Sequence, residues 1–247
     1  MKKKWVFLSP HLDDAVYSCG GLIADQTRRG SQVEIWSICA GDPPAGPLTL
    51  FAKALHARWK TGREAVAVRR AEDRLACGLV AAQPRHFDLP DSVYRRDPDT
   101  GKAFYRSTGD IFGQPAEKEI SAIRERFMPI LGPLLDGQER LVLPLGIGGH
   151  VDHQLVRMLG ERLSPAPWYY ADVPYALDAS RDWGALLPGR GGWRIFPLSA
   201  QGFRRWFAAA AAYASQLSTF WEDEWAMEAS FAAHRDRFNG IPLWQPQ

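Results

Sequence analysis

Short apolar runs alternate with longer segments of helical periodicity along this chain. Residues Trp5 to Leu8 are all apolar and end at a Ser-Pro pair, which predicts a buried strand. Helix-forming residues from Gly20 to Arg29 follow, and a glycine closes them. Gln32 to Cys39 is rich in β-branched and aromatic residues and breaks at a Gly-Asp-Pro-Pro segment, so a second strand is predicted. The chain therefore opens with a βαβ unit.

The alternation continues through the rest of the sequence. The same criteria predict helices at 48–79, 115–135, from about 150 and at 201–218, and strands at 85–89, 141–145 and 168–173. Strands that alternate with helices favour a mostly parallel sheet covered on both faces. We therefore predict an α/β fold, a Rossmann-like three-layer sandwich with a mostly parallel central sheet, formed by a single domain over residues 1–247.

One polar, glycine-rich segment, at about 92–114, interrupts the alternation. Two stretches that combine aromatic and basic residues, 94–96 and 104–106, flank the turn-like sequence between Asp97 and Lys102. This pattern predicts a hairpin-like flap. Such a flap either covers a site as a lid that excludes water or lies at an interface between subunits, and the sequence leaves both open.

Composition and charge exclude several classes of partner. The 247 residues are 46% hydrophobic and 23% charged, and the net charge of +2 gives no electrostatic footprint for nucleic acid. The apolar runs are too short for a signal peptide or for the ~20 residues that span a bilayer. Three widely spaced cysteines form neither a disulfide framework nor a CxxC zinc motif. We expect a cytoplasmic protein without nucleic acid or a membrane span, and a homo-oligomer is compatible with the sequence.

Two clusters of histidine and aspartate follow predicted strands. His11, Asp13 and Asp14 come after the first strand, and His150, Asp152 and His153 come after the strand at 141–145. Both clusters can reach one crevice, because the carboxyl ends of parallel strands meet at one edge of a sheet. A catalytic zinc typically keeps three nitrogen or oxygen ligands and an open position for water, and His11, Asp14 and His153 can supply them. Of the adjacent Asp13 and Asp14, one would bind metal and the other would act as a base.

These clusters resemble the motifs of the LmbE-like, or PIG-L, family of N-acetylglucosaminyl deacetylases. Pro10-His11-Leu12-Asp13-Asp14 is similar to the family's Pro-His-Pro-Asp-Asp motif, and His150-Val-Asp-His153 is similar to its His-x-Asp-His motif. Weaker similarities lie at Gly41-Asp42, Arg69-x-x-Glu72, Leu89-Pro90-Asp91 and Tyr213-x-Ser215-Gln216, so the resemblance covers roughly residues 5–220. Leu12 replaces the usual proline and Ala15 a frequent glutamate, but neither change removes a ligand or the base.

The resemblance implies a zinc enzyme with one metal ion per chain, in a site that also accepts other divalent metals. It assigns zinc binding to His11, Asp14 and His153. It makes Asp13 the general base, and His150 the group that polarises the tetrahedral intermediate, with Asp152 as an orienting partner. It places Asp42, Arg69 and Asp91 around the sugar of a small amino-sugar substrate.

The reaction that these assignments predict is hydrolysis of an N-acetyl amide on an N-acetylglucosamine-type compound or glycoconjugate, which releases acetate and a free amine. One alternative is an amidase that cleaves a larger acyl or thiol-conjugated amide. Another is a non-catalytic Rossmann-like module that binds a sugar or nucleotide, with structural histidines. The glycines at 146–149 lack the G-x-G-x-x-G spacing of a dinucleotide loop.

Overall fold

A seven-stranded sheet forms the centre of the protein. The computed structural model describes residues 4–247 and orders the strands β3-β2-β1-β4-β5-β7-β6. Their bounds are β1 Trp5–Ser9, β2 Val33–Ser37, β3 Gln83–His86, β4 Arg140–Pro144, β5 Trp168–Tyr170, β6 Gly191–Phe196 and β7 Ile241–Pro246. The first five strands pair in parallel, whereas β7 pairs antiparallel with β5 and with β6. The prediction of a mostly parallel central sheet is confirmed.

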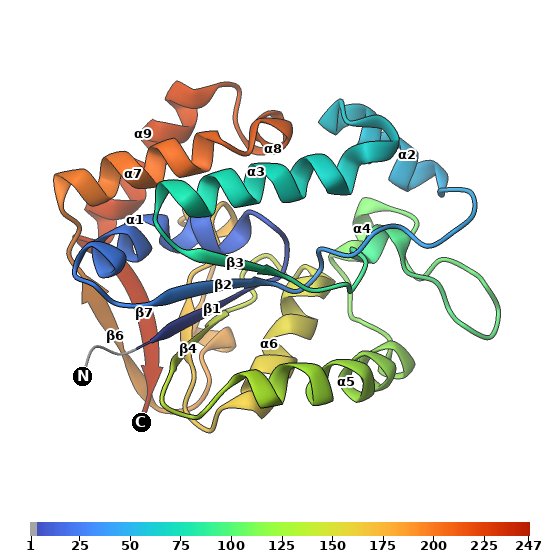
Figure 1. Cartoon of the computed structure of the whole chain (residues 1–247), viewed down its shortest axis with the longest axis horizontal. Helices are drawn as coiled ribbons and strands as arrows, with labels where there is room; N and C mark the ends of the chain where they lie inside the picture. The colour runs from blue at the N-terminus through green and yellow to red at the C-terminus, as the bar shows by residue number, and fades with distance from the viewer. Residues whose placement is uncertain (1–3) are drawn as a thin grey trace.

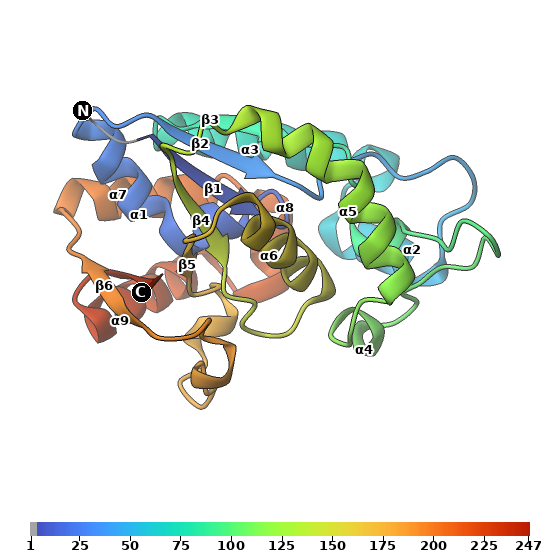
Figure 2. The ribbon, with the colours of Figure 1, turned by 90° about the horizontal axis from the view of Figure 1, so that it is seen from below.

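Helices cover both faces of this sheet. Figure 1 shows α1, α3 and α7 above the sheet and α5 and α6 below it, and Figure 2 shows the α5 and α6 side. The helices are α1 Asp14–Arg28, α2 Leu50–Trp59, α3 Ala65–Leu79, α4 Thr108–Ile111, α5 Glu117–Leu131, α6 Val151–Leu163, α7 Ala200–Ala211, α8 Ala214–Phe220 and α9 Glu224–Phe238. The three layers of the predicted sandwich are therefore present.

Helix α1 begins earlier than its sequence indicated. The predicted start was Gly20, but the helix begins at Asp14, and every residue from Asp14 to Asp25 is buried. A helix buried on all sides has no polar face, so its first turns carry no amphipathic pattern. The close packing depends on glycine: a Cβ at Gly20 would lie 2.6 Å from the Trp206 ring of α7.

Other boundaries also differ from the prediction. The predicted helix 201–218 is two helices, α7 and α8, and the strand predicted at 168–173 ends at Tyr170. The predicted strand 85–89 is β3 at Gln83–His86, because the chain leaves the ladder beside β2 after His86. The antiparallel strands β6 and β7 and helix α9 were not predicted.

The position of β1 in the sheet defines a crevice. Strand β1 lies between β2 and β4. The strands β2 and β3 extend the sheet on one side of β1, and β4 and β5 extend it on the other side, so the strand order reverses at β1. Ligands of open α/β sheets bind outside the carboxyl ends of the strands at such a point. One histidine cluster follows β1, and the other follows its neighbour β4.

The segment 92–114 lies beyond this end of the sheet. It starts with a single turn of 3₁₀ helix, Ser92–Tyr94, and contains one antiparallel bridge, between Arg96 and Ala103. Helix α4 follows the bridge. The predicted flap thus corresponds to a tight turn and a short helix, at the right of Figure 1.

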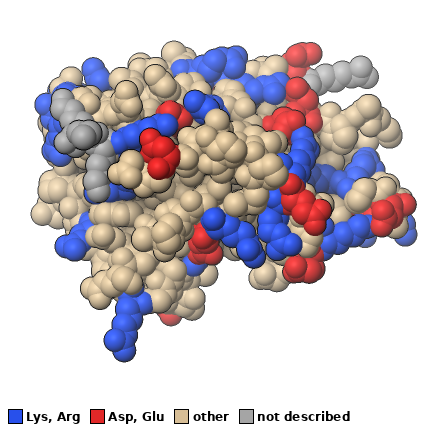
Figure 3. All heavy atoms as spheres, turned by 60° about the horizontal axis from the view of Figure 1, so that its bottom comes forward, with Lys and Arg blue, Asp and Glu red and all other residues tan. Residues whose placement is uncertain are grey.

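Basic and acidic side chains are interspersed on the face of the molecule that Figure 3 shows. Neither sign forms a continuous surface there. Among residues 4–247, no helix combines the length and the apolar character that crossing a membrane requires.

Candidate metal centre and active site

The loop after β1 places His11 beside Asp14. The Ser9 hydroxyl donates to the His11 carbonyl at 2.5 Å and accepts from the Ala15 amide at 3.0 Å, which closes the loop onto the start of α1. The His11 amide in turn donates to the Asp14 carboxylate at 2.7 Å. Ser9, at the end of the strand, therefore stabilises a tight turn. In this turn the side chain of Asp14 is buried and that of His11 is nearly so.

The loop after β4 places the second pair of histidines. Gly148 has φ +98°, and a Cβ there would lie 2.6 Å from the ring of Tyr175, so only glycine fits this bend. His150 then caps α6, where its Nδ1 accepts from the Asp152 amide at 3.2 Å. His153 follows in the first turn of α6 and is fully buried.

His11, Asp14 and His153 have the geometry of a metal-ligand set. Each offers one ligand atom, and these atoms lie within 4.8 Å of one another. The Asp14 carboxylate is 3.2 Å from His11 Nδ1 and 3.4 Å from His153 Nε2. Two ligands of a tetrahedral zinc, each about 2.1 Å from the ion, lie about 3.4 Å apart. His153 Nε2 is also buried without a hydrogen-bond partner, as expected of a nitrogen whose lone pair binds a metal.

A carboxylate holds the other ring nitrogen of each of these histidines. His11 Nε2 is 2.9 Å from Asp152, and His153 Nδ1 is 2.7 Å from Asp172. The amides of Gly146 and Ile147 donate to Asp172 at 2.8 and 2.9 Å and fix its orientation. Such carboxylate partners set the tautomer and ring position of metal-binding histidines. They direct His11 Nδ1 and His153 Nε2 toward Asp14.

The charges around these three side chains favour a cation. Burial opposes protonation of His153, but Asp14 and Asp172 outweigh it and raise its pKa to about 10. Burial is likewise outweighed at His11, whose pKa Asp91 and Asp14 raise well above the usual range. Burial disfavours ionised Asp14, yet His153 and His11 hold its pKa well below the usual range. The negative potential that attracts protons here would equally attract a divalent ion.

Asp13 is a buried carboxylate that lies outside this ligand set. Burial raises its pKa to about 6, against the opposing effect of Arg69. Arg69 lies 3.4 Å from Asp13 and stacks over the ring of Trp59. A carboxylate with a pKa near neutrality is suited to accept and return a proton.

His150 lies beside His11 with its ring almost perpendicular, at a centroid distance of 4.9 Å. Because its Nδ1 accepts a backbone hydrogen bond, Nε2 carries the proton of the neutral ring. Burial, helped by the charge of His11, lowers the pKa of His150 to about 3, which keeps the ring neutral. The Asp152 carboxylate is 4.0 Å from His150 but 2.9 Å from His11, so it orients His11 rather than His150.

A cavity of about 150 Å³ joins these groups. Arg69 and Asp91 line it, with a separation of 3.9 Å between them, beside aromatic residues of α2 and α8 and beside Phe112, which follows α4. Asp42 does not line this cavity; it is exposed and binds Arg70 at 2.5 Å. The structure thus brings together eight of the nine predicted site residues and leaves Asp42 apart.

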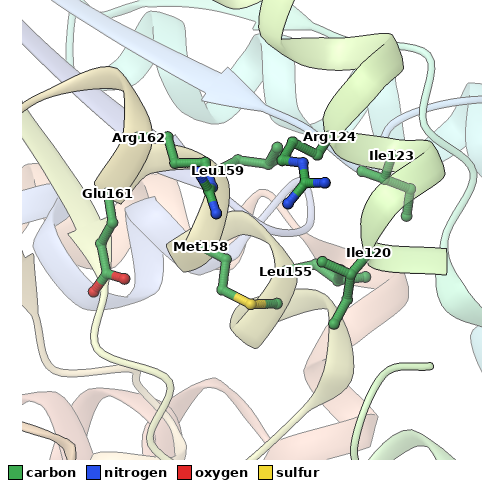
Figure 4. A pocket seen from close by; sticks show the side chains of 8 residues that line it. All are labelled: Ile120, Ile123, Arg124, Leu155, Met158, Leu159, Glu161 and Arg162. Atoms are coloured by element: carbon green, nitrogen blue, oxygen red, sulfur yellow. The ribbon is translucent and has the colours of Figure 1, made fainter. Parts of the chain in front are cut away.

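A second hollow, of about 220 Å³, lies between α5 and α6 (Figure 4). Its lining consists of Ile120, Ile123, Arg124, Leu155, Met158, Leu159, Glu161 and Arg162. Although it is larger, it holds no histidine or cysteine, and Glu161 is already bound to Arg157. The smaller cavity therefore carries the chemistry.

Three buried residues near the metal centre were missed in the sequence. Asp172 follows β5 but lies inside the strand predicted at 168–173, so the sequence held no signal for it. Arg95 and Glu119 lie in the flap segment and in α5, and no local pattern singles them out.

A mostly parallel sheet with a buried cluster of histidine and aspartate at its switch point, beside a further buried carboxylate, is an arrangement typical of a metal-dependent hydrolase. The chain matches the PIG-L family, GlcNAc-PI de-N-acetylase, over residues 6–163, and it belongs to that family. Deacetylases of this family depend on a metal.

Two relatives support this family assignment, and a solved structure shares the fold. The chain is similar to a 2'-N-acetylparomamine deacetylase of Niallia circulans, with 26% identity over 70% of this chain and 68% of the relative. It is 31% identical to a 2'-N-acetylparomamine deacetylase of Streptomyces fradiae, over 69% of this chain and 57% of the relative. Its fold matches a crystal structure of the zinc-inhibited form of a teicoplanin deacetylase (TM-score 0.84, 24% identity, 98% and 97% of the two chains). The prediction of an N-deacetylase of the PIG-L family is confirmed.

Proposed function

We propose that this protein is a zinc-dependent deacetylase that hydrolyses the N-acetyl group of an N-acetylglucosamine-type sugar within a larger small molecule. One observation carries the proposal: His11, Asp14 and His153 direct ligand atoms at one point, including a buried nitrogen without a hydrogen-bond partner, and Asp13 lines the cavity beside His11 and Asp14. The named activities of the aminoglycoside and teicoplanin relatives favour acetyl over a larger acyl group.

The proton transfers are assigned to Asp13. Amide hydrolysis needs a base to activate water and an acid to protonate the departing nitrogen. Asp13, with a pKa of about 6, takes the proton from water and returns it to the amine. Bound zinc supplies Lewis-acid polarisation of the carbonyl and increases the acidity of water. Its proposed ligands are His11, Asp14 and His153.

His150 is proposed to stabilise the negative charge that develops on the acetyl oxygen. Its Nδ1 is occupied by a backbone amide, so Nε2 is the free donor, and the residue lines the cavity. A hydrogen bond that strengthens in the transition state typically contributes ~3–4 kcal/mol. Arg69 and Asp91, on the cavity wall, are proposed to bind sugar hydroxyls. Asp42 has no such contact in this proposal because it reaches only Arg70.

Acetate release tests this proposal. Purified protein, stripped of metal and reloaded with zinc, is assayed with N-acetylglucosamine, N-acetylated aminoglycosides and N-acetylglucosaminyl glycopeptides. We expect acetate from at least one conjugate, no activity in the metal-free protein, and a loss of at least about a hundredfold for His153→Ala. Asp236→Asn, at an exposed position of α9 that does not line the cavity, is the control. Zinc-loaded protein that leaves every acetyl group intact would contradict the proposal.

A further inference from the structure

A chain of buried polar contacts connects the flap segment with His11. The Tyr105 hydroxyl donates to Glu119, and Arg95 Nε donates to the other oxygen of Glu119 at 2.6 Å. Arg95 Nη1 then donates to Asp152 Oδ1 at 2.5 Å, and Asp152 Oδ2 accepts from His11 Nε2 at 2.9 Å. These contacts, here called the Arg95 relay, join segment 92–114, α5, α6 and the loop after β1.

The Arg95 relay is almost completely shielded from water. The exposed fractions are 7% for Arg95, 4% for Glu119 and 0% for Asp152. Burying ionised side chains costs free energy of desolvation, and well-packed apolar residues of the same volume often stabilise a protein as much or more. Stability alone therefore does not explain why these three charged side chains are buried. A need to hold one of the side chains in a fixed orientation does explain it.

The orientation that the relay fixes is that of Asp152. Its Oδ1 is held by Arg95, and its Oδ2 receives both His11 Nε2 and the Ser92 amide, the latter at 3.1 Å. Arg95 is held in turn by Glu119 and by the Pro90 carbonyl at 3.2 Å. Because these two partners fix the planar guanidinium, it can hold the Asp152 carboxylate in one rotamer. His11 must then present Nδ1 to Asp14.

We propose that Arg95 is a positioning residue for the metal centre, acting through Asp152 on the His11 imidazole. None of its atoms needs to touch substrate or metal. The same residue anchors the flap segment, since its carbonyl accepts from the Phe104 amide at 3.1 Å. Phe112, at the end of that segment, lines the cavity. The relay thus holds the cavity wall and the metal ligand in a fixed mutual position.

Zinc affinity and the absorption spectrum of the cobalt-substituted protein test this inference without substrate. The first variant is Arg95→Lys, which keeps the buried positive charge but lacks the planar fork. The second is Asp152→Asn, which keeps the shape but removes the carboxylate. Loss of an outer partner of a metal-binding histidine typically weakens metal binding ~10–100-fold. We expect a loss in that range for Asp152→Asn, a loss of about tenfold for Arg95→Lys, and shifted cobalt bands in both.

Arg126→Lys is the matched control, because Arg126 lies on α5 and binds the exposed Asp88 at 2.6 Å outside the relay. Its zinc affinity and cobalt spectrum should equal those of the wild type. Wild-type zinc affinity and cobalt spectrum in Arg95→Lys would overturn the inference. So would a loss of affinity fully matched by lower stability of the metal-free protein, because that pattern indicates a structural role alone. If Arg95→Lys does not fold, Glu119→Gln, which weakens the hold on Arg95 Nε, takes its place.

The inference rests on the proposed metal site, but the two can fail separately. Zinc binding without acetate release from any conjugate would contradict the proposed function and leave the role of Arg95 intact. A wild-type protein that binds no zinc would overturn both.

Discussion

Asp13 and Asp14 are chemically identical neighbours that the fold places in opposite environments. Asp14 faces His11 and His153, which hold its pKa well below the usual range against the effect of burial. Asp13 faces Arg69 across 3.4 Å, and burial raises its pKa to about 6. Two carboxylates whose pKa values are driven apart can divide the work of metal binding and proton transfer.

This division predicts opposite phenotypes for two isosteric substitutions. Asp14→Asn should weaken zinc binding at least tenfold, because a charged ligand becomes a neutral amide. Asp13→Asn should bind zinc as the wild type does but lose about 10²–10⁴ in kcat, the usual contribution of a general base. Chelator competition measures the affinity, and acetate release measures kcat. Equal loss of metal in both variants would show that the two roles are wrongly assigned.

The sequence identified the central residues of the site because each cluster is compact. His11, Asp13 and Asp14 fall within four positions, as do His150 and His153, and each cluster follows a strand that its apolar residues reveal. Asp172 was missed because it is a single aspartate that lies inside the strand predicted at 168–173. Its role arises only when the sheet places β5 beside β4.

At the scale of elements, helices and strands with a clear pattern were predicted and the edge of the sheet was not. Strand β6 begins with two glycines, and β7 carries a proline at its second position and another at its end, features that the sequence criteria treat as breaks. Helix α9 buries Met227, Phe231 and His234 along one narrow line and exposes most of the rest. These positions have helical spacing, but one of them is a histidine and the exposed side carries apolar residues such as Trp225, so the sequence shows little contrast between the two sides of the helix.

His234 makes α9 sensitive to acid. Burial, reinforced by Arg237, lowers its pKa to about 4, below the ~6.5 of an unfolded chain. The unfolded state therefore binds more protons between these values, and stability falls as the pH drops through that window. At pH 5 the loss from this residue alone should be about 2 kcal/mol relative to pH 7.5. His234→Gln cannot titrate and should show a flatter dependence.

Denaturant unfolding of both proteins at several pH values measures this difference. Groups other than His234 titrate equally in the two, so their contributions cancel. Stability curves that run parallel from pH 7.5 to pH 5 would mean that His234 is not held neutral in the folded protein.

At the scale of the whole molecule, the proposed metal centre joins parts of the chain that are distant in sequence. His11 and Asp14 belong to the β1 and α1 side of the switch point, and His153 belongs to α6 on the opposite face of the sheet. Because the unfolded chain does not hold these ligands together, an ion that binds the folded protein shifts the folding equilibrium. Catalysis and stability should therefore depend on the same three side chains.

The size of this coupling follows from mass action. Free zinc at a hundred times its dissociation constant should raise the free energy of unfolding by about 2.7 kcal/mol, which for a chain of this size corresponds to roughly 5–10 °C in Tm. Thermal unfolding of the metal-free protein across a zinc titration measures it. In His153→Ala the shift should vanish, whereas in Asp13→Asn it should persist, because Asp13 lies outside the ligand set. A Tm that does not respond to zinc in the wild type would contradict a metal site that spans the switch point.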